Sequence, residues 1–152
     1  MRGIDALVIS DYDKGYIHTG DILDIITPAS TMGIPILVDF KKQDLSKFEN
    51  CIIKINKTES DRVKKLPVAC ELIISLGPDG CMWNNTVYPT KAVDVHDVCG
   101  AGDVFLASFV YMYLKTSSNI QQSIKFANKC ATLSVTHPGT YILTKHDIVS
   151  CL

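Results

Sequence analysis

The sequence predicts a three-layer α/β fold, in which helices cover both faces of a mainly parallel sheet. Short β-branched runs alternate with helical patterns in the first half of the chain, as in βαβ units, and the last third is mostly helical. The chain has 152 residues, of which 47% are hydrophobic, enough for one globular domain with its own core over 1–152. We find no internal repeat or low-complexity linker.

The strands are expected where apolar runs of three to six residues end in polar or turn-forming residues. The first run, 4–9, is closed by Ser10-Asp11, as in a strand buried on both faces. Asn84-Asn85 is a plausible two-residue hairpin turn between two short strands. The expected strands are 4–9, 34–38, 51–55, 72–76, 81–83 and 86–88.

Three helices are expected, at 19–31, 103–114 and 120–135. Pro28 should end or kink the first helix early, because proline lacks the N–H that a helix interior requires. The second helix is apolar on nearly every side, which indicates burial. The third should stop before His137-Pro138-Gly139.

Charge and apolar patterning exclude several classes of protein. The chain has 15 Lys+Arg against 16 Asp+Glu and no run of like charges, so we expect neither nucleic acid nor an anionic membrane as a partner. No apolar run approaches the roughly 18 residues of a membrane span, and Met1 does not begin a signal peptide, so we expect a soluble, cytoplasmic protein. The six cysteines are scattered without a metal-ligand pattern, which favours core positions for most of them.

The stretch most informative about chemistry is 97–103, Asp-Val-Cys-Gly-Ala-Gly-Asp, directly before the apolar helix. Small residues at Gly100, Ala101 and Gly102 let backbone N–H groups converge, and the helix start adds partial positive charge, so this stretch suits phosphate. Asp103 could accept a proton from an attacking hydroxyl. The alternative is a glycine-rich turn in which Asp103 is an ordinary helix cap.

The same stretch resembles the D-T-x-G-A-G-D signature of the ribokinase-like, or PfkB, carbohydrate kinases, with Val98 at the threonine position. Three further motifs occur in the family's order: 56–59, Asn-Lys-Thr-Glu, is similar to N-x-x-E; 75–80 is similar to the [ST]-x-G-x-x-G nucleotide loop; 126–128 and 135–139 resemble the helix and loop that close over adenine. The resemblance implies a partial ribokinase-like (Rossmann-like) fold, equivalent to the C-terminal, nucleotide-binding half of such a kinase.

The resemblance also implies roles for individual residues. Asp103 would be the catalytic base, and the N–H groups of 100–103 would stabilise charge on the transferred phosphoryl group. Glu59 would organise Mg²⁺ through water, and Asp97 would belong to a loop that binds a monovalent cation such as K⁺, together with carbonyls of residues 99, 134, 137 and 139. The residues implied in ATP binding are Asn56, Ser75, Gly77, Gly80 and Asn128.

The beginning of the chain resembles one branch of the family, the heptose-7-phosphate kinases of lipopolysaccharide precursor synthesis. The similarity is carried by 10–15, Ser-Asp-Tyr-Asp-Lys-Gly, and by 38–41, where Phe40 replaces the usual proline. This implies a sugar phosphate, heptose 7-phosphate, as the phosphoryl acceptor. Asp11, Lys14 and Lys41 can equally be polar residues at loop ends.

The resemblance covers only half of a family kinase and lacks the N-terminal sugar-binding half and its lid. The strand at 4–9 should therefore be an exposed sheet edge, open to a second copy or a partner chain. A fragment, half of a split kinase and a nucleotide-binding remnant are all compatible with this, as is an interaction module without kinase activity. A nucleotidyltransferase is disfavoured, because 18–21, His-Thr-Gly-Asp, lacks the second histidine of H-x-G-H.

Overall fold

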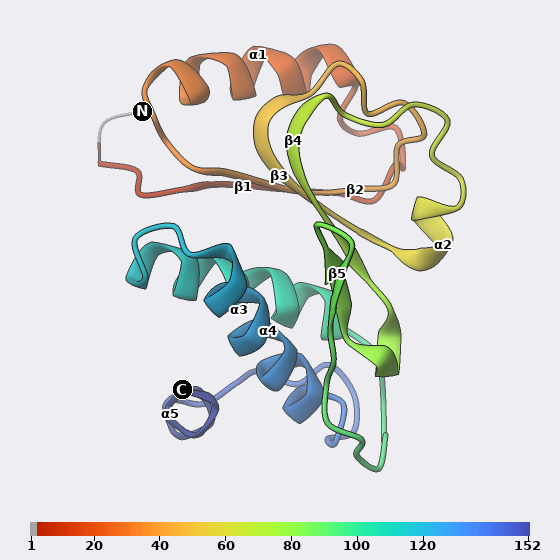
Figure 1. Ribbon diagram of the computed structural model, residues 1–152, viewed down its shortest axis with the longest axis vertical. Helices are drawn as coiled ribbons and strands as arrows, with labels where there is room; N and C mark the ends of the chain where they lie inside the picture. Colours follow the sequence, from red (N-terminus) through yellow and green to blue (C-terminus); the bar gives the residue numbers. More distant parts are fainter. Residues whose placement is uncertain (1–2) are drawn as a thin grey trace. The chain divides into compact units, whose positions relative to one another are not determined.

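The computed structural model describes residues 3–152 and divides the chain into two compact units (Figure 1). The first unit extends to Leu76 and includes Met82–Thr86. The second unit consists of Gly77–Cys81 and Val87–Leu152. No helix in the described part of the chain is both long enough and apolar enough to cross a membrane.

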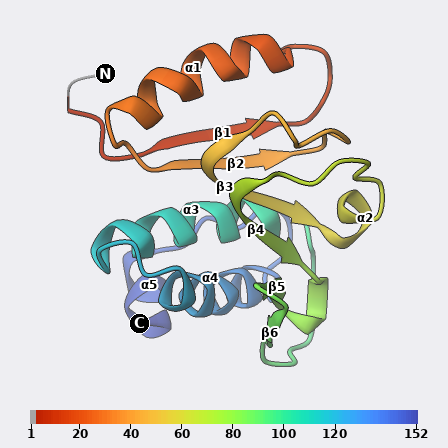
Figure 2. The same ribbon diagram turned by 45° about the horizontal axis from the view of Figure 1, so that its top comes forward.

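The strands follow one another in the sheet in the order in which they occur in the sequence (Figure 2). The first four, β1 to β4, pair in parallel, and β1 forms one edge. The edge position expected for the first strand is therefore confirmed. The strands are β1 (Leu7–Asp11), β2 (Ile36–Phe40), β3 (Glu49–Asn56), β4 (Ala69–Ser75), β5 (Cys81–Trp83) and β6 (Thr86–Tyr88).

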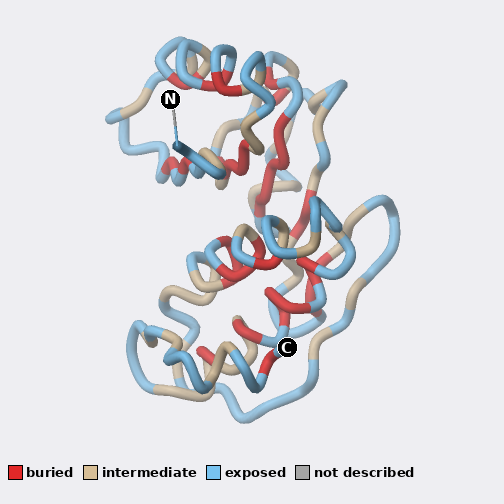
Figure 3. Tube along the Cα trace, turned by 90° about the vertical axis from the view of Figure 1, so that its left-hand side faces the viewer, coloured by how far each residue is buried: buried red, intermediate tan, exposed pale blue. Residues whose placement is uncertain are grey.

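The core of the first unit lies between the parallel strands and helix α1 (Thr19–Thr31). Ile22, Ile26 and Ala29 form the buried stripe of α1, at the spacing that places side chains on one helix face. They pack with strand residues that are almost all apolar, as expected for parallel strands in a core. Figure 3 shows this burial along the strands and on one side of the helix.

The second unit is built on three helices: α3 (Ala101–Lys115), α4 (Ile120–Ser134) and α5 (Lys145–Cys151). Helix α4 packs against both α3 and α5. Met112, Phe126, Cys130 and Cys151 form a buried cluster among them. A 3₁₀ turn, Gly77–Asp79, precedes β5.

The expected elements are present, with shifted ends. The hairpin at Asn84-Asn85 is confirmed: both residues have positive φ, 53° and 58°, which asparagine tolerates better than most residues. The first strand is Leu7–Asp11 and not 4–9, because its pairing with β2 continues through the polar Ser10 and Asp11. The remaining predicted strands and helices differ from the observed ones by up to three residues at an end.

The expected early end of the first helix at Pro28 was wrong, and two short helices were not predicted. Pro28 does not end α1, which continues to Thr31. Pro28 and Asp24 are both exposed, so the Asp24 carbonyl that loses its helical N–H partner can bond to water. The short helix α2 (Lys57–Ser60) and helix α5 were not expected, although each begins at a capping box.

Candidate functional site

The amino-terminal end of α3 is set by a glycine in a left-handed conformation. Gly100 precedes the helix with φ +78°, and a Cβ there would lie 2.9 Å from Thr140 Cγ2. Its carbonyl accepts from the Val104 N–H at 2.9 Å, and the Ala101 N–H donates to the Val98 carbonyl at 3.2 Å. Glycine at this position therefore satisfies both the backbone conformation and the close approach of the 135–140 loop.

This helix start has the properties of an anion site. The first N–H groups of an α-helix lack acceptors within the helix and carry partial positive charge. Ala101 uses its N–H for Val98, so this donor could contribute to an anion only as a shared hydrogen bond. Asp103 occupies the third helical position and its residue is exposed, which leaves the carboxylate accessible from solvent. The chemistry that this arrangement suits is phosphate binding beside a proton acceptor.

Asp97 joins the loop before α3 to the loop after α4. Its two carboxylate oxygens accept from the Cys99 N–H at 2.8 Å and the Gly139 N–H at 3.1 Å. The His96 N–H, moreover, donates to the Val135 carbonyl at 2.8 Å. The structure thus brings Asp97 to the segment that the sequence assigned to a cation loop. Because both oxygens already bond to N–H groups, the carboxylate orients the loops, and backbone carbonyls remain as potential cation ligands.

The Asn56-x-x-Glu59 motif forms a reciprocal capping box at the start of α2. The Asn56 Oδ1 accepts from the Glu59 N–H at 2.8 Å, and the Glu59 Oε2 accepts from the Asn56 N–H at 2.7 Å. Ser75 is the β4 partner of Asn56 in the sheet, so the structure brings these three predicted residues together at the carboxyl ends of β3 and β4. Because the capping bond uses Oε2, the second carboxylate oxygen of Glu59 is suited to accept from a water on Mg²⁺.

The Gly77–Gly80 turn and Asn128 belong to the second unit and are linked through Tyr88. Gly80 has φ +91°, and a Cβ there would lie 2.1 Å from the Tyr88 carbonyl oxygen. The same oxygen accepts from Asn128 Nδ2 at 2.8 Å, and Asn128 is only 7% exposed. Gly80 and Asn128 thus have contacts within the chain that account for their residue types. Their assignment to a nucleotide site stays a prediction.

A row of charged side chains lies at the carboxyl ends of β1 to β3, where Lys42 and Lys54, which the sequence did not single out, pair with Asp11 and Asp39 of the heptose-kinase-like segments. Lys42 lies 2.8 Å from Asp11 Oδ2, and Lys54 lies 2.6 Å from Asp39 Oδ2. All four side chains are at most 14% exposed. Asp39 and Lys54 are register partners in adjacent strands, and only that pairing could have revealed their contact.

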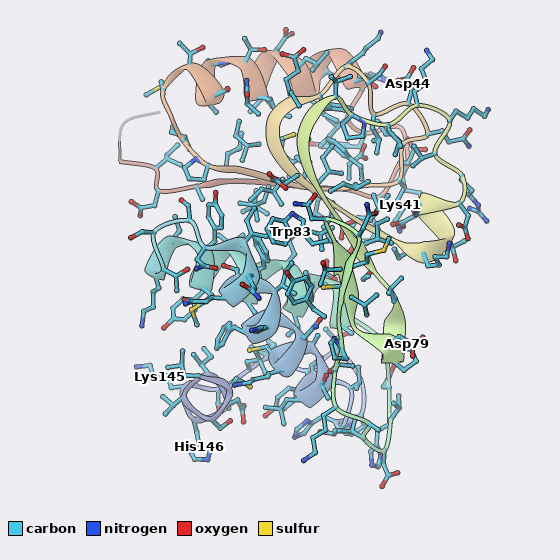
Figure 4. All side chains as sticks on the ribbon, in the orientation of Figure 1. Lys41, Asp44, Asp79, Trp83, Lys145 and His146 are labelled. Atoms are coloured by element: carbon cyan, nitrogen blue, oxygen red, sulfur yellow. The ribbon has the colours of Figure 1, made fainter. Side chains whose placement is uncertain are left out.

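The ion pair controls the ionisation of Asp11 and Lys42. Burial raises the pKa of Asp11, but hydrogen bonds from Lys42 and from the Asp13 N–H, with the Lys42 charge, outweigh it and lower the pKa overall. Burial lowers the pKa of Lys42, and the bonds to Asp11 and Asp13 outweigh it and raise the pKa. Beside this pair, Lys41 Nζ lies 4.6 Å from the centre of the Tyr12 ring; Lys41 is labelled in Figure 4.

The predicted residues form separate groups within each of the two units. The first unit brings together Asn56, Glu59 and Ser75. The second unit joins the 97–103 loop to the 135–140 loop and, separately, Gly80 to Asn128. Within residues 3–152, no group of three or more His, Cys, Asp or Glu side chains is arranged to hold a metal ion.

Solved structures with a similar fold include ribokinases and a phosphofructokinase. The structure is similar to ribokinase of Arabidopsis thaliana complexed with ribose and ATP, with a TM-score of 0.69 and 19% identity over 85% of this chain and 51% of that one. Phosphofructokinase-2 of Escherichia coli in complex with potassium gives a TM-score of 0.76 and 18% identity over 96% and 55% of the two chains. At such identities the likeness shows the fold, and the predicted partial ribokinase-like fold is confirmed.

Sequence comparison identifies the family directly. Residues 38–147 match the pfkB family carbohydrate kinases, and this chain belongs to that family. The bifunctional protein HldE of Aliarcobacter butzleri is 32% identical over 170 residues, which cover 97% of this chain and 36% of that protein. The chain thus spans little more than a third of the length of the curated relatives it matches.

Proposed function

We propose that residues 1–152 act as one nucleotide-binding half of a sugar kinase, which transfers a phosphoryl group from ATP to a hydroxyl of heptose 7-phosphate. The observation that carries the proposal is the start of α3, where left-handed Gly100 is followed within three residues by the exposed Asp103. Family membership and the similarity to HldE support the class of reaction and the heptose acceptor.

In this proposal Asp103 removes the proton from the attacking hydroxyl, and N–H groups of 100–103 hold the transferred phosphoryl group. No side chain needs to be phosphorylated, since positioning and electrostatic stabilisation suffice for this reaction. Ser75, Gly77, Gly80 and Asn128 would line the nucleotide site. Gly80 and Asn128 would do so indirectly, because their contacts with Tyr88 fix the shape of this segment.

Two ions belong to the proposal. When bound, Mg²⁺ would neutralise phosphate charge, and Glu59 would orient its water with the oxygen that does not bond to Asn56. Asp97 would hold the loops on which carbonyls bind K⁺. An exposed edge at β1 is available to a second copy of the chain or to a partner chain.

The first test is nucleotide binding by the isolated chain. Titration calorimetry with MgATP should show binding, and Tm should rise with MgATP concentration. Folded protein, verified by circular dichroism, that neither binds MgATP nor gains thermal stability would refute the nucleotide site. That result would favour the alternative, an interaction module without kinase activity.

The second test is catalysis in a coupled ATP-consumption assay with heptose 7-phosphate. Turnover by this chain should be slow, and Asp103→Asn should lower it at least about 100-fold while MgATP binding persists, as loss of a general base requires. Asp147→Asn is a matched control, because Asp147 also occupies the third position of a helix and lies in the same unit. A similar loss in both variants would show a structural effect and remove Asp103 from the role of base. Binding without any turnover would identify a nucleotide-binding remnant.

A further inference from the structure

Two cysteine side chains of the first unit are in contact near the amino-terminal ends of β3 and β4. The Cys51 and Cys70 Sγ atoms lie 3.4 Å apart, although 19 positions separate the residues in the sequence. Both are free thiols. They lie where the β3–β4 register shifts, between Glu49 and Ile52. A disulfide bond is about 2.05 Å long, so the two sulfurs, which lie on adjacent paired strands, would have to move closer to form one.

The two thiols differ in accessibility and in acidity. Cys51 is 5% exposed, whereas Cys70 is partly exposed and can meet a small reagent from solvent. The hydrogen bond with Cys51 lowers the pKa of Cys70 against burial and the nearby charges of Glu49 and Glu71, whereas the Cys70 thiol itself donates to the Phe48 carbonyl at 3.1 Å. The hydrogen bond between the two cysteines, with burial, raises the pKa of Cys51. Because Cys70 is the more exposed of the two thiols, it is the one suited to react first, and Cys51 lies in contact with it to react second.

We propose that Cys51 and Cys70 are a redox modification site, which forms a reversible disulfide by exchange with a low-molecular-weight disulfide such as oxidised glutathione. The Cys70 thiolate attacks one sulfur of the reagent, forms a mixed disulfide and releases one glutathione thiolate. Cys51 then gives its proton to solvent and attacks the Cys70 sulfur, which releases the second thiolate. The pair loses two electrons and two protons, and oxidised glutathione becomes two molecules of glutathione.

The disulfide would close a loop that contains α2 and the Asn56-Glu59 capping box. The cross-link lies near the amino ends of the two strands, whereas the capping box follows the carboxyl end of β3. Oxidation therefore restrains the segment without consuming any residue of the proposed kinase site. Closing a loop of this length reduces the freedom of the unfolded chain, so the oxidised protein should be the more stable form.

The test is disulfide mapping of the full chain in glutathione redox buffers, with free thiols blocked before digestion. Trypsin with a glutamate-specific protease cleaves after Glu71 and so separates Cys70 from Cys81. The expected product is a peptide pair joined through Cys51 and Cys70. Tm should rise by about 5 °C or more on oxidation and return with reductant. The exposed Cys99 reports that the reagent acts, since it should become glutathionylated.

Two variants separate the steps. Cys51→Ser should leave glutathione trapped on Cys70, and Cys70→Ser should leave the buried Cys51 unmodified. Cys99→Ser is the matched control and should keep the Cys51–Cys70 link. The proposal is overturned if Cys99 is glutathionylated while no Cys51–Cys70 link forms, or if Cys70 of the unsubstituted chain stops at the mixed disulfide. It is also overturned if the link is no more frequent in the folded chain than in the urea-unfolded chain. The mapping uses the unsubstituted chain, so a variant that fails to fold does not affect the conclusion about the disulfide. The outcome of the ATP tests does not affect it either.

Discussion

Replacing Gly80 by alanine should destabilise the second unit strongly, for reasons that involve no ligand. The new Cβ would lie 2.1 Å from the Tyr88 carbonyl oxygen and 2.9 Å from the Thr90 N. Both are backbone atoms and cannot turn aside as a side chain can. The Tyr88 oxygen is also held by Asn128 Nδ2 at 2.8 Å, so moving it away breaks a buried hydrogen bond.

The cost can be worked from these contacts. Ordinary van der Waals contact begins at 3.4 Å, so the Tyr88 oxygen would have to retreat by 1.3 Å from its present 2.1 Å. A shift of that size breaks the hydrogen bond from the Asn128 amide. Leaving this buried donor unsatisfied costs about 1–3 kcal/mol of stability. The positive φ of +91° adds about 1–2 kcal/mol for any residue with a Cβ. The expected loss is therefore about 2–5 kcal/mol, a large share of the roughly 5–15 kcal/mol that stabilise a typical domain.

Urea unfolding followed by far-ultraviolet circular dichroism measures this loss through the shift of the unfolding midpoint. Gly77→Ala is the matched control: Gly77 lies in the same turn with φ +62°, and a Cβ added to it would have no described atom within 4 Å. It should cost only the backbone share of about 1–2 kcal/mol. Equal losses in the two variants would refute the steric account of Gly80 and leave close approach to a ligand as the reason for glycine there.

Three further outcomes are expected. Lys54→Met should lower the free energy of unfolding by about 3 kcal/mol in urea titrations, because the largely buried Asp39 carboxylate loses the ammonium group that balances its charge. Adding Asp39→Leu should recover most of this loss, and no recovery would contradict the reasoning. Folding lowers the pKa of Asp11, so the stability of the unsubstituted chain relative to Asp11→Asn should fall as pH drops below 3.8. Folding raises the pKa of Lys42, so the stability that its charge contributes should be lost above pH 10.5. A stability difference that does not change with pH would refute the coupling. Gly102→Ala should keep or raise the urea midpoint of unfolding, since alanine favours helix over glycine by about 1 kcal/mol. The same variant should bind MgATP at least about tenfold more weakly in calorimetry. A loss of stability would instead assign Gly102 to packing.

The elements of the fold could be predicted largely because their signals are local. Alternating runs, turn residues and the Asn84-Asn85 pair identified the strands and the hairpin. The predictions were wrong where the end of a strand or helix depends on residues far away in the sequence. Strand β1 extends through Ser10 and Asp11 because β2 continues beside it, and no property of these two residues alone favours a strand. Pro28 is tolerated because its side of the helix is exposed, which depends on how α1 packs.

The candidate site shows the same division. Its motifs were recognisable, because each is a short run in sequence. The contacts of Asp39 with Lys54 and of Cys51 with Cys70 join different strands and depend on register, which a single sequence does not reveal. Helix α5 was missed for a different reason: its capping box at Thr144 was present in the sequence, but the helix is too short for a clear apolar period.

Contacts within the chain account for two of the motif glycines. Gly80 needs to be glycine because of Tyr88, and Gly100 because of its φ and Thr140. Gly102 is different, because it lies in the first turn of α3, where helical backbone does not require glycine and alanine would be more favourable. A glycine here would let a ligand approach the backbone closely, as the proposed phosphate site requires. The proposed phosphate site at this helix start therefore predicts that Gly102→Ala weakens MgATP binding without loss of stability, and a loss of stability would assign Gly102 to packing within the chain.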